Sequence, residues 1–342
     1  MNQNYLSREN TDCLKGICAI MVVICHVCSR TNIGASIGLG PIYTAFGYWA
    51  VSGFMFMSGY GLTRSILNKY NGGGGYLQIF LSKRVLPIYM LMALLSVVYY
   101  GMGHLLALEP PSLSCFIQSF FFGNTVIKFG WFLQAIVVIY LLFYISARIS
   151  TKVAHTNPEA ALCILMTFAL SLYMGGCLIM NLSDTWYETV LAFLAGMLIA
   201  ANKPVVDMIL ATKWRTIWIL TILLFAFAFC FLFRRASFVP ELPAMILKMI
   251  TSPLFVLCWI PVMRLKSLAN PFTAFLSKLF LEIYICQGLA FLLLSNKYWN
   301  LEGWSFFFSV FPLTILMAWA VKPLTTRFME WGKNLRNSIK SK

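Results

Sequence analysis

Long apolar runs, separated by short polar segments, make up almost the whole chain. Most runs hold about 17 to 25 residues, the length that a helix needs to cross the hydrocarbon core of a bilayer. The run "SCFIQSFFFGN", Ser114 to Asn124, is too short to cross and is predicted to be half-inserted or interfacial. The pattern predicts an all-α integral membrane protein, a bundle of about ten transmembrane helices. The predicted spans are residues 14–30, 41–62, 85–107, 130–148, 160–181, 186–201, 214–233, 244–262, 275–295 and 304–324.

Composition leaves little room for another class of protein. Of the 342 residues, 60% are hydrophobic and 11% are charged, and the mean hydropathy is +0.79. A soluble globular domain carries about 25% charged residues. The net charge of +15 comes from basic residues scattered between the apolar runs, not clustered on one polar segment. We therefore expect the lipid bilayer as the main surrounding and no nucleic-acid partner.

The distribution of basic residues predicts the orientation of the bundle. Positively charged loops tend to stay in the cytoplasm, so the side with more Lys and Arg is expected to be inside. With the N-terminus inside, all but six of the 26 Lys and Arg residues lie in cytoplasmic segments. Because ten is an even number, both termini are then cytoplasmic. The six residues on the outer side are Arg30, Lys128, Arg234, Arg235, Lys248 and Lys297.

The ten cysteines, among them Cys18, Cys25, Cys163, Cys230 and Cys286, lie mostly inside apolar runs. This pattern is typical of small core residues. We expect neither a disulfide framework nor a bound metal.

The first apolar run carries ionisable residues. It follows a polar head of about a dozen residues without a convincing cleavage site, so we expect it to remain as the first helix. Lys15 and His26 are eleven residues apart, which places them on nearly the same helix face and about 16 Å apart along the axis. His26 is thus expected near the bilayer midplane. Asp12, three residues before Lys15, can pair with it at the interface.

Buried ionisable residues have two interpretations here. His26 is a candidate general base, since an unperturbed imidazole has a pKa near 6.5, but it could also be a neutral side chain that hydrogen-bonds between helices. Glu282 is a candidate partner for His26 or for an acceptor, or it forms a structural pair with Lys278. The basic segment "TRSILNKYNGGGGYLQIFLSKR" could approach phosphates through backbone N–H groups, or it is a flexible linker.

The sequence also resembles a known family, the acyltransferase 3 group of integral membrane acyltransferases. "DCLKGICAIMVVICH" is similar to its first-helix pattern, in which D-x-L-R-G precedes a histidine, although Lys15 stands where arginine is usual. Lysine supplies a point charge in place of a bidentate fork. Other segments resemble later family motifs, in order: "AVSGFMFMSGYGL", "FLSKRVLPIY" with Arg84 and Pro87 but Leu81 in place of a first arginine, "GWFL", and "LEIYICQG" with Gln287 in place of the common histidine.

This resemblance implies transfer of an acyl group, most often acetyl, from acyl-CoA on the cytoplasmic side to a hydroxyl of a cell-surface or lipid-linked carbohydrate. It implies His26 as general base, with Lys15, Asp12 and Glu282 as further catalytic candidates. Lys15, Lys83, Arg84 and the loop from Gly72 to Gly75 would meet the phosphates of the donor. The candidate substrate-binding residues are Trp131, Ser58, Tyr60, Tyr284 and Gln287.

Simpler readings exist for two of these residues. A tryptophan that starts a span is often an interfacial anchor, which applies to Trp131. A serine beside glycine usually mediates close helix packing, which applies to Ser58. His104 and His155 fall near span ends, and no role is assigned to them.

The expected organisation is a single transmembrane acyltransferase domain over residues 1–342, with a core at about 8–325 and a short basic cytoplasmic tail at 326–342. We expect no extracytoplasmic hydrolase-like domain, a location in the cytoplasmic membrane, and possible partners among glycan-assembly proteins. The alternative is a transporter or exporter subunit, in which His26, Glu282 and Lys15 form a proton or substrate path. Internal repeats, which many transporters carry, are not evident.

Overall fold

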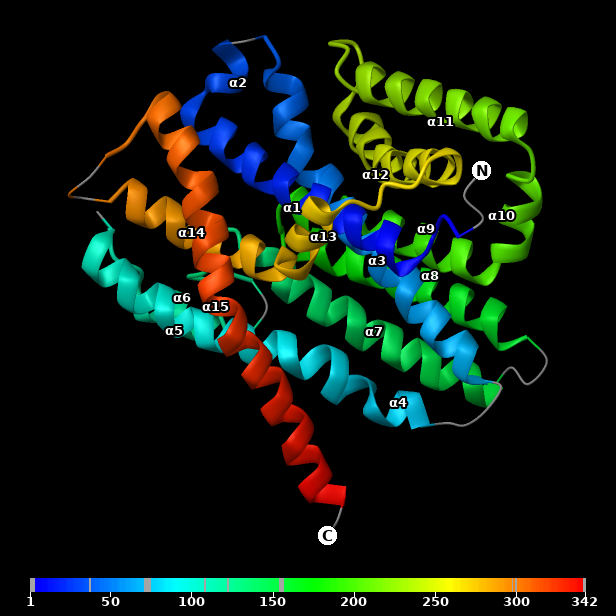
Figure 1. Cartoon of the computed structure of the whole chain (residues 1–342), viewed down its shortest axis with the longest axis horizontal. Helices are drawn as coiled ribbons and strands as arrows, with labels where there is room; N and C mark the ends of the chain where they lie inside the picture. Colours follow the sequence, from blue (N-terminus) through cyan, green and yellow to red (C-terminus); the bar gives the residue numbers. More distant parts are fainter. Residues whose placement is uncertain are drawn as a thin grey trace. The chain divides into compact units, whose positions relative to one another are not determined.

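The computed structural model describes residues 4–340 except residues 37, 71–74, 108, 122, 154–156, 297 and 299. The chain is 82% helical, and within the described residues the only extended pairing is one isolated bridge between Ser295 and Asn300 (Figure 1). The all-α prediction is confirmed. The helices are α1 Arg8–Thr31, α2 Ile33–Ser36, α3 Gly40–Tyr70, α4 Gly75–Phe80, α5 Leu86–Leu106, α6 Leu113–Gln118, α7 Trp131–Val153, α8 Pro158–Ile179, α9 Val190–Ala201, α10 Lys203–Ile209, α11 Lys213–Phe233, α12 Glu241–Leu265, α13 Pro271–Lys278, α14 Phe280–Leu294 and α15 Gly303–Lys340, with a π-helical turn η1 at Leu81–Val85 and a 3₁₀ turn η2 at Asp184–Trp186.

Membrane spans can be counted among the described residues by length and apolar composition. Seven helical segments qualify, and two helix pairs that are bent at a short break raise the number to nine. These nine correspond to nine of the ten predicted spans. The tenth, predicted at 41–62, falls in α3, which is 31 residues long but does not qualify. Its glycine, serine, tyrosine and tryptophan residues lower its mean hydropathy.

One predicted span is followed by a sharp bend, and another is interrupted. The span predicted at 186–201 includes α9 and is followed, after Asn202, by α10, which bends away by 85°. The span predicted at 275–295 is divided at Leu279 into α13 and α14. The sequence analysis ended the first of these spans at residue 201, where α9 ends, but it predicted neither the bend into α10 nor the break at Leu279. The segment around Ser114 forms the six-residue helix α6, too short to cross, as predicted.

Several helix ends follow from local sequence. The side chain of Asn157 caps α8, and Pro158 follows it at the first helical position. The side chain of Thr212 caps α11. Asn32 and Asn181 follow α1 and α8 with φ of 54° and 51°. Asparagine tolerates this left-handed conformation, which ends a helix and satisfies its last carbonyls.

The chain forms two compact units, each built from separate segments. Unit 1 comprises Met1–Ile20, Tyr48–Gly73 and Ser150–Lys278, and unit 2 comprises Met21–Gly47, Gly74–Ile149 and Leu279–Lys342. Neither unit is a continuous stretch of sequence. The expectation of one transmembrane domain over residues 1–342 therefore stays a prediction.

In unit 1, α12 packs against α9 and α11, and α8 and α10 pack against α9 (Figure 1). Gly59 of α3 lies against the backbone of Phe193, and Gly196 of α9 lies against the backbone of Phe56, so the two helices approach closely. At the N-terminus, the Tyr5 hydroxyl donates a hydrogen bond of 2.8 Å to Asp207. Burial and the neighbouring carboxylate raise the pKa of Tyr5.

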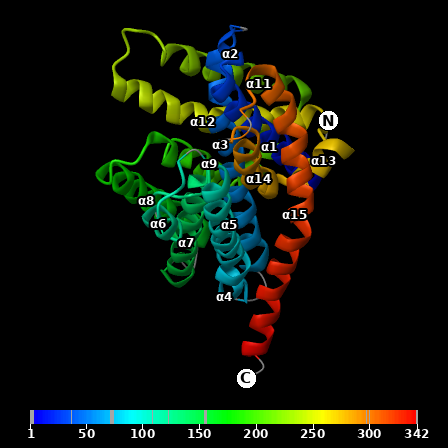
Figure 2. The same cartoon turned by 90° about the vertical axis from the view of Figure 1, so that its left-hand side faces the viewer.

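In unit 2, α14 packs along α15, and α5 contacts both of them (Figures 1 and 2). Phe80 of α4 is fully buried and stacks on Phe143 and Tyr144 of α7. The turn η1 packs against α5 and α15. Figure 2 shows α15 as one long helix, which continues to Lys340, so the expected tail at 326–342 is helical as far as that residue.

Candidate functional site

His26 lies on α1, five residues before the helix ends at Thr31. Along the helix it is therefore nearer the end than the middle, whereas its spacing from Lys15 suggested a position near the midplane. Its imidazole stacks on the ring of Phe129, with centroids 3.6 Å apart and planes 11° apart. Both residues belong to unit 2. One face of the imidazole is thus covered by an aromatic ring.

Phe129 is held in position from several sides. It lies in the segment before α7 with φ of 65°, a left-handed conformation that is uncommon for a bulky residue. Its carbonyl oxygen accepts a hydrogen bond of 2.5 Å from the hydroxyl of Tyr284, which is on α14. Its ring meets the ring of Phe291 edge to face, with centroids 5.5 Å apart. A strained backbone that neighbouring groups hold in place is common at functional sites.

The contact with Phe129 occupies the face of the imidazole and does not engage its ring nitrogens. Within the described part of the chain, no residue hydrogen-bonds to the ring nitrogens of His26. The ammonium of Lys128 lies over the rings of Phe129 and Phe291, 5.6 and 5.2 Å from their centroids. Partial burial and the nearby charge of Arg30 lower the pKa of Lys128.

Asp12 and Lys15 form the predicted ion pair, with 2.8 Å between Nζ and Oδ1. Arg8 approaches the other carboxylate oxygen of Asp12 at 3.6 Å. These residues lie in unit 1, whereas His26 lies in unit 2. That Lys15 and His26 serve one site therefore stays a prediction.

Glu282 is 1% exposed and has partners that the sequence analysis did not name. Its Oε1 accepts hydrogen bonds from Lys322 at 3.0 Å and from Thr325 at 2.6 Å. The pair arises because α15 packs along α14 and brings together residues that are 40 positions apart. The Oε2 atom has no hydrogen-bond partner among the described residues. Within unit 2, Glu282 is thus paired with Lys322, and its role as a partner of His26 or of an acceptor stays a prediction.

Of the predicted substrate-binding residues, three lie in unit 2. Tyr284 is buried, and its hydroxyl donates a hydrogen bond to the Phe129 carbonyl. Gln287 is fully buried and donates a hydrogen bond of 2.9 Å to the Tyr284 carbonyl, while its Oε1 has no partner among the described residues. Trp131 is the first residue of α7 and meets Phe132 edge to face. Tyr284 and Gln287 are therefore brought together.

The other two, Ser58 and Tyr60, lie on α3 in unit 1. Both are partly buried, and the ring of Tyr60 stacks on that of Phe56. That Ser58 and Tyr60 serve the same site as His26 therefore stays a prediction.

The predicted donor-binding residues Lys83 and Arg84 are exposed on the π-helical turn η1. Arg84 lies close to Tyr76 and Tyr140. A π-helical turn widens a helix locally and occurs frequently at functional sites. The glycines at 72–74 lie outside the described residues, and Gly75 is the first residue of α4.

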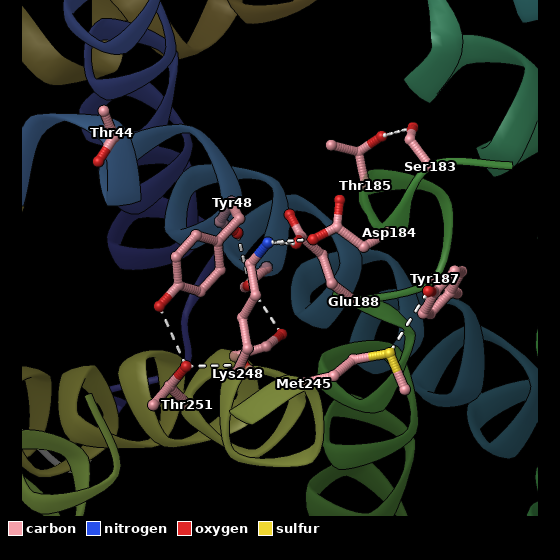
Figure 3. A network of polar contacts seen from close by, with 12 residues as sticks. Thr44, Tyr48, Ser183, Asp184, Thr185, Tyr187, Glu188, Met245, Lys248 and Thr251 are labelled. Atoms are coloured by element: carbon pink, nitrogen blue, oxygen red, sulfur yellow. Dashed lines mark hydrogen bonds and ion pairs between the residues drawn. The ribbon is translucent and has the colours of Figure 1, made fainter. Parts of the chain in front are cut away.

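A network in unit 1 was missed by the sequence analysis (Figure 3). The ammonium of Lys248, on α12, lies 2.5 Å from a carboxylate oxygen of Asp184 and 2.5 Å from one of Glu188. Nearby, the Tyr48 hydroxyl is 3.1 Å from that of Thr251. The available signal was a lysine inside a predicted span, which needs an acidic partner. The network ties α12 to the segment that leads into α9.

Among the described residues, no group of three or more His, Cys, Asp or Glu side chains lies close enough together to hold a metal ion. In comparisons with known proteins, the family model described as an acyltransferase domain, Acyl_transf_3, matches residues 8–322, nearly the whole chain. No curated protein matches the chain, and no solved structure does.

Proposed function

Because the chain belongs to the acyltransferase 3 family, we propose that this multi-pass membrane acyltransferase moves an acyl group, acetyl in the first instance, from acyl-CoA to a hydroxyl of a cell-surface or lipid-linked carbohydrate. The proposed location is the cytoplasmic membrane, with the donor on the cytoplasmic side. The proposed partners are the acyl-CoA, the carbohydrate or glycolipid acceptor and proteins of glycan assembly.

The observation that carries this proposal is the arrangement of His26 on Phe129. A stacked ring restricts the plane of the imidazole without engaging its nitrogens, which the proposed reaction requires. In the proposed reaction, a ring nitrogen takes the proton of the acceptor hydroxyl while the oxygen attacks the thioester carbonyl. The C–O bond forms, the C–S bond breaks, and the imidazolium returns a proton to the departing thiolate. General base catalysis of this kind contributes roughly 10²- to 10⁴-fold in rate.

The donor phosphates are assigned to the exposed basic residues. Lys83 and Arg84 on η1 supply two cations from adjacent positions of one turn, and a guanidinium can bind phosphate with two hydrogen bonds. Lys15 is proposed as a third cation, oriented by its ion pair with Asp12. The developing negative charge on the thioester oxygen needs a hydrogen-bond donor near His26, and Lys128 is the proposed donor in unit 2.

The test compares two histidine variants, His26→Ala and His104→Ala. His104 is exposed on α5 and serves as the matched control. We expect His26→Ala to lower acyl transfer by roughly 10²-fold or more, because the base is lost, while the control retains wild-type activity. The measurement is mass spectrometry of the cell-surface glycan, together with release of CoA by purified protein. Normal acylation with His26→Ala, at wild-type protein levels in the membrane, would contradict the assignment.

The transporter alternative is favoured by one observation, the ion pair of the buried Glu282 with the partly exposed Lys322, in which one carboxylate oxygen has no hydrogen-bond partner among the described residues. Ionisable residues inside membrane proteins often mark substrate or proton pathways. Purified protein in liposomes separates the two functions. Acyl transfer without movement of solute supports the enzyme, and solute movement without CoA release supports the transporter.

A further inference from the structure

A cavity of about 280 Å³ lies at the C-terminal end of α1 in unit 2. Its wall comes from the end of α1 and from the residues that lead into α15. Most of the surface that it offers is polar. The lining residues are Arg30, Thr31, Asn32, Leu301, Glu302 and Gly303.

The polar side chains at this cavity are linked to one another. Arg30 donates a hydrogen bond of 3.4 Å to Oδ1 of Asn300, and Nδ2 of Asn300 donates one of 2.9 Å to Oε1 of Glu302. The guanidinium of Arg30 also lies over the ring of Phe306, 5.3 Å from its centroid. Arg30 and Glu302 in the wall, with Asn300 beside it, thus offer both hydrogen-bond donors and acceptors.

The cavity is adjacent to His26. Arg30 follows His26 by four residues on α1, so both lie on one helix face about 6 Å apart along the axis. A series of aromatic contacts also links His26 to Arg30. Phe129, which stacks on His26, meets Phe291, and Phe291 meets Phe306 beneath Arg30, with centroids 5.0 Å apart in the last contact.

We propose that this cavity binds one sugar ring of the acceptor, next to the ring whose hydroxyl receives the acyl group; this rests on the proposed function of His26. A sugar presents hydroxyls that both donate and accept hydrogen bonds, and the Arg30, Asn300 and Glu302 network matches both needs. A volume near the lower end of the range for small-molecule sites, about 300 to 1,000 Å³, suits a single ring and excludes a longer segment.

The carboxylate of Glu302 favours a neutral sugar over a phosphate group. An anion bound by Arg30 would lie close to this second negative charge and would be repelled by it. Inorganic phosphate therefore serves as a competing probe.

Binding is tested with the full chain in detergent by saturation-transfer NMR, with methyl β-glucoside and N-acetylglucosamine as probes. The variants are Glu302→Ala and Arg30→Gln, and Glu241→Ala, an exposed acid at the start of α12, is the matched control. Removal of one hydrogen-bonding partner is expected to weaken sugar binding roughly 5- to 10-fold, with no change in the control. Melting curves of each variant establish that the fold is retained.

The outcomes separate this inference from the proposed function. Sugar binding by wild type and by His26→Ala, with loss in Glu302→Ala, supports the cavity even if no acyl transfer is found. Equal binding of both sugars by wild type, Glu302→Ala and Arg30→Gln overturns it, as does failure of wild type to bind either sugar. Phosphate could instead displace the sugars and bind wild type as tightly as it binds Glu302→Ala. This result would identify an anion site at Arg30 and would also overturn the inference.

Discussion

At the scale of single residues, Phe129 has an energetic cost that its neighbours must offset. A left-handed backbone at a non-glycine residue costs of order 1–3 kcal/mol. The buried hydrogen bond from Tyr284 contributes about 0.5–1.5 kcal/mol, and each aromatic pair adds a similar amount. We therefore propose Tyr284 as a positioning residue, which acts on His26 through Phe129.

We expect Tyr284→Phe to lower kcat roughly 3- to 10-fold with little change in the KM for acyl-CoA, because the loop relaxes and His26 is less well oriented. Steady-state kinetics of purified protein measures both parameters. Tyr89→Phe is the matched control, since it also removes a hydroxyl that donates to a backbone carbonyl, that of Phe120. A rise in KM with kcat unchanged would indicate that Tyr284 contacts substrate directly.

The sequence predicted residue contacts only where they are local. The ion pair of Asp12 with Lys15 follows from their spacing of three on one helix. The contact of His26 with Phe129 and that of Glu282 with Lys322 join residues far apart in the chain, and hydrophobic periodicity contains no information about such pairs. The need of Glu282 for a partner was predictable, but the identity of the partner required the packing of α14 on α15.

At the scale of elements, the sequence predicted where apolar segments lie better than how they are interrupted. Nine of the ten predicted spans contain a qualifying helix or helix pair. The bend after α9, the break before α14 and the π-helical turn at η1 were missed, because each depends on backbone geometry that apolar side chains do not reveal. These irregular positions carry Lys83 and Arg84 and adjoin Glu282, so the functional candidates lie near the elements that were hardest to predict.

The crossing of α3 and α9 gives a prediction at this scale. A Cβ atom at Gly59 would clash with the carbonyl of Phe193, and one at Gly196 with the carbonyl of Phe56. Backbone atoms cannot move aside without separating the helices, so Gly59→Ala should destabilise the protein by about 1–3 kcal/mol. Gly61→Ala is the control, because no atom lies within 4 Å of the added methyl group. Apparent melting temperatures in detergent should fall for the first variant only, and equal values would refute close packing at Gly59.

At the scale of the whole molecule, orientation depends on whether α3 crosses the membrane. Ten spans place both termini on one side, whereas nine place them on opposite sides. The excess of Lys and Arg in alternate segments favours ten. The hydrophobic core of α3, which includes the fully buried Met55 and Ala50, is compatible with a span that is enclosed by other helices.

We therefore expect a fluorescent protein fused after Lys342, and one fused before Met1, to be fluorescent in the cytoplasm. Alkaline phosphatase fused after Ala236, between α11 and α12, should be active because that segment is predicted to lie outside. Loss of fluorescence at only one of the two termini would show that the number of spans is odd, as expected if α3 does not cross.

The segmented composition of the two units also has a consequence for biosynthesis. All three segments of unit 1 have been translated once Lys278 is added, but unit 2 still lacks α14 and α15 at that point. Until they are inserted, Glu282, Tyr284 and Lys322 are absent, and neither α5 nor the loop that carries Phe129 has its final packing partners. Because domains tend to assemble in the order of synthesis, unit 1 can close during translation, whereas the surroundings of His26 are completed only when the last helices leave the ribosome.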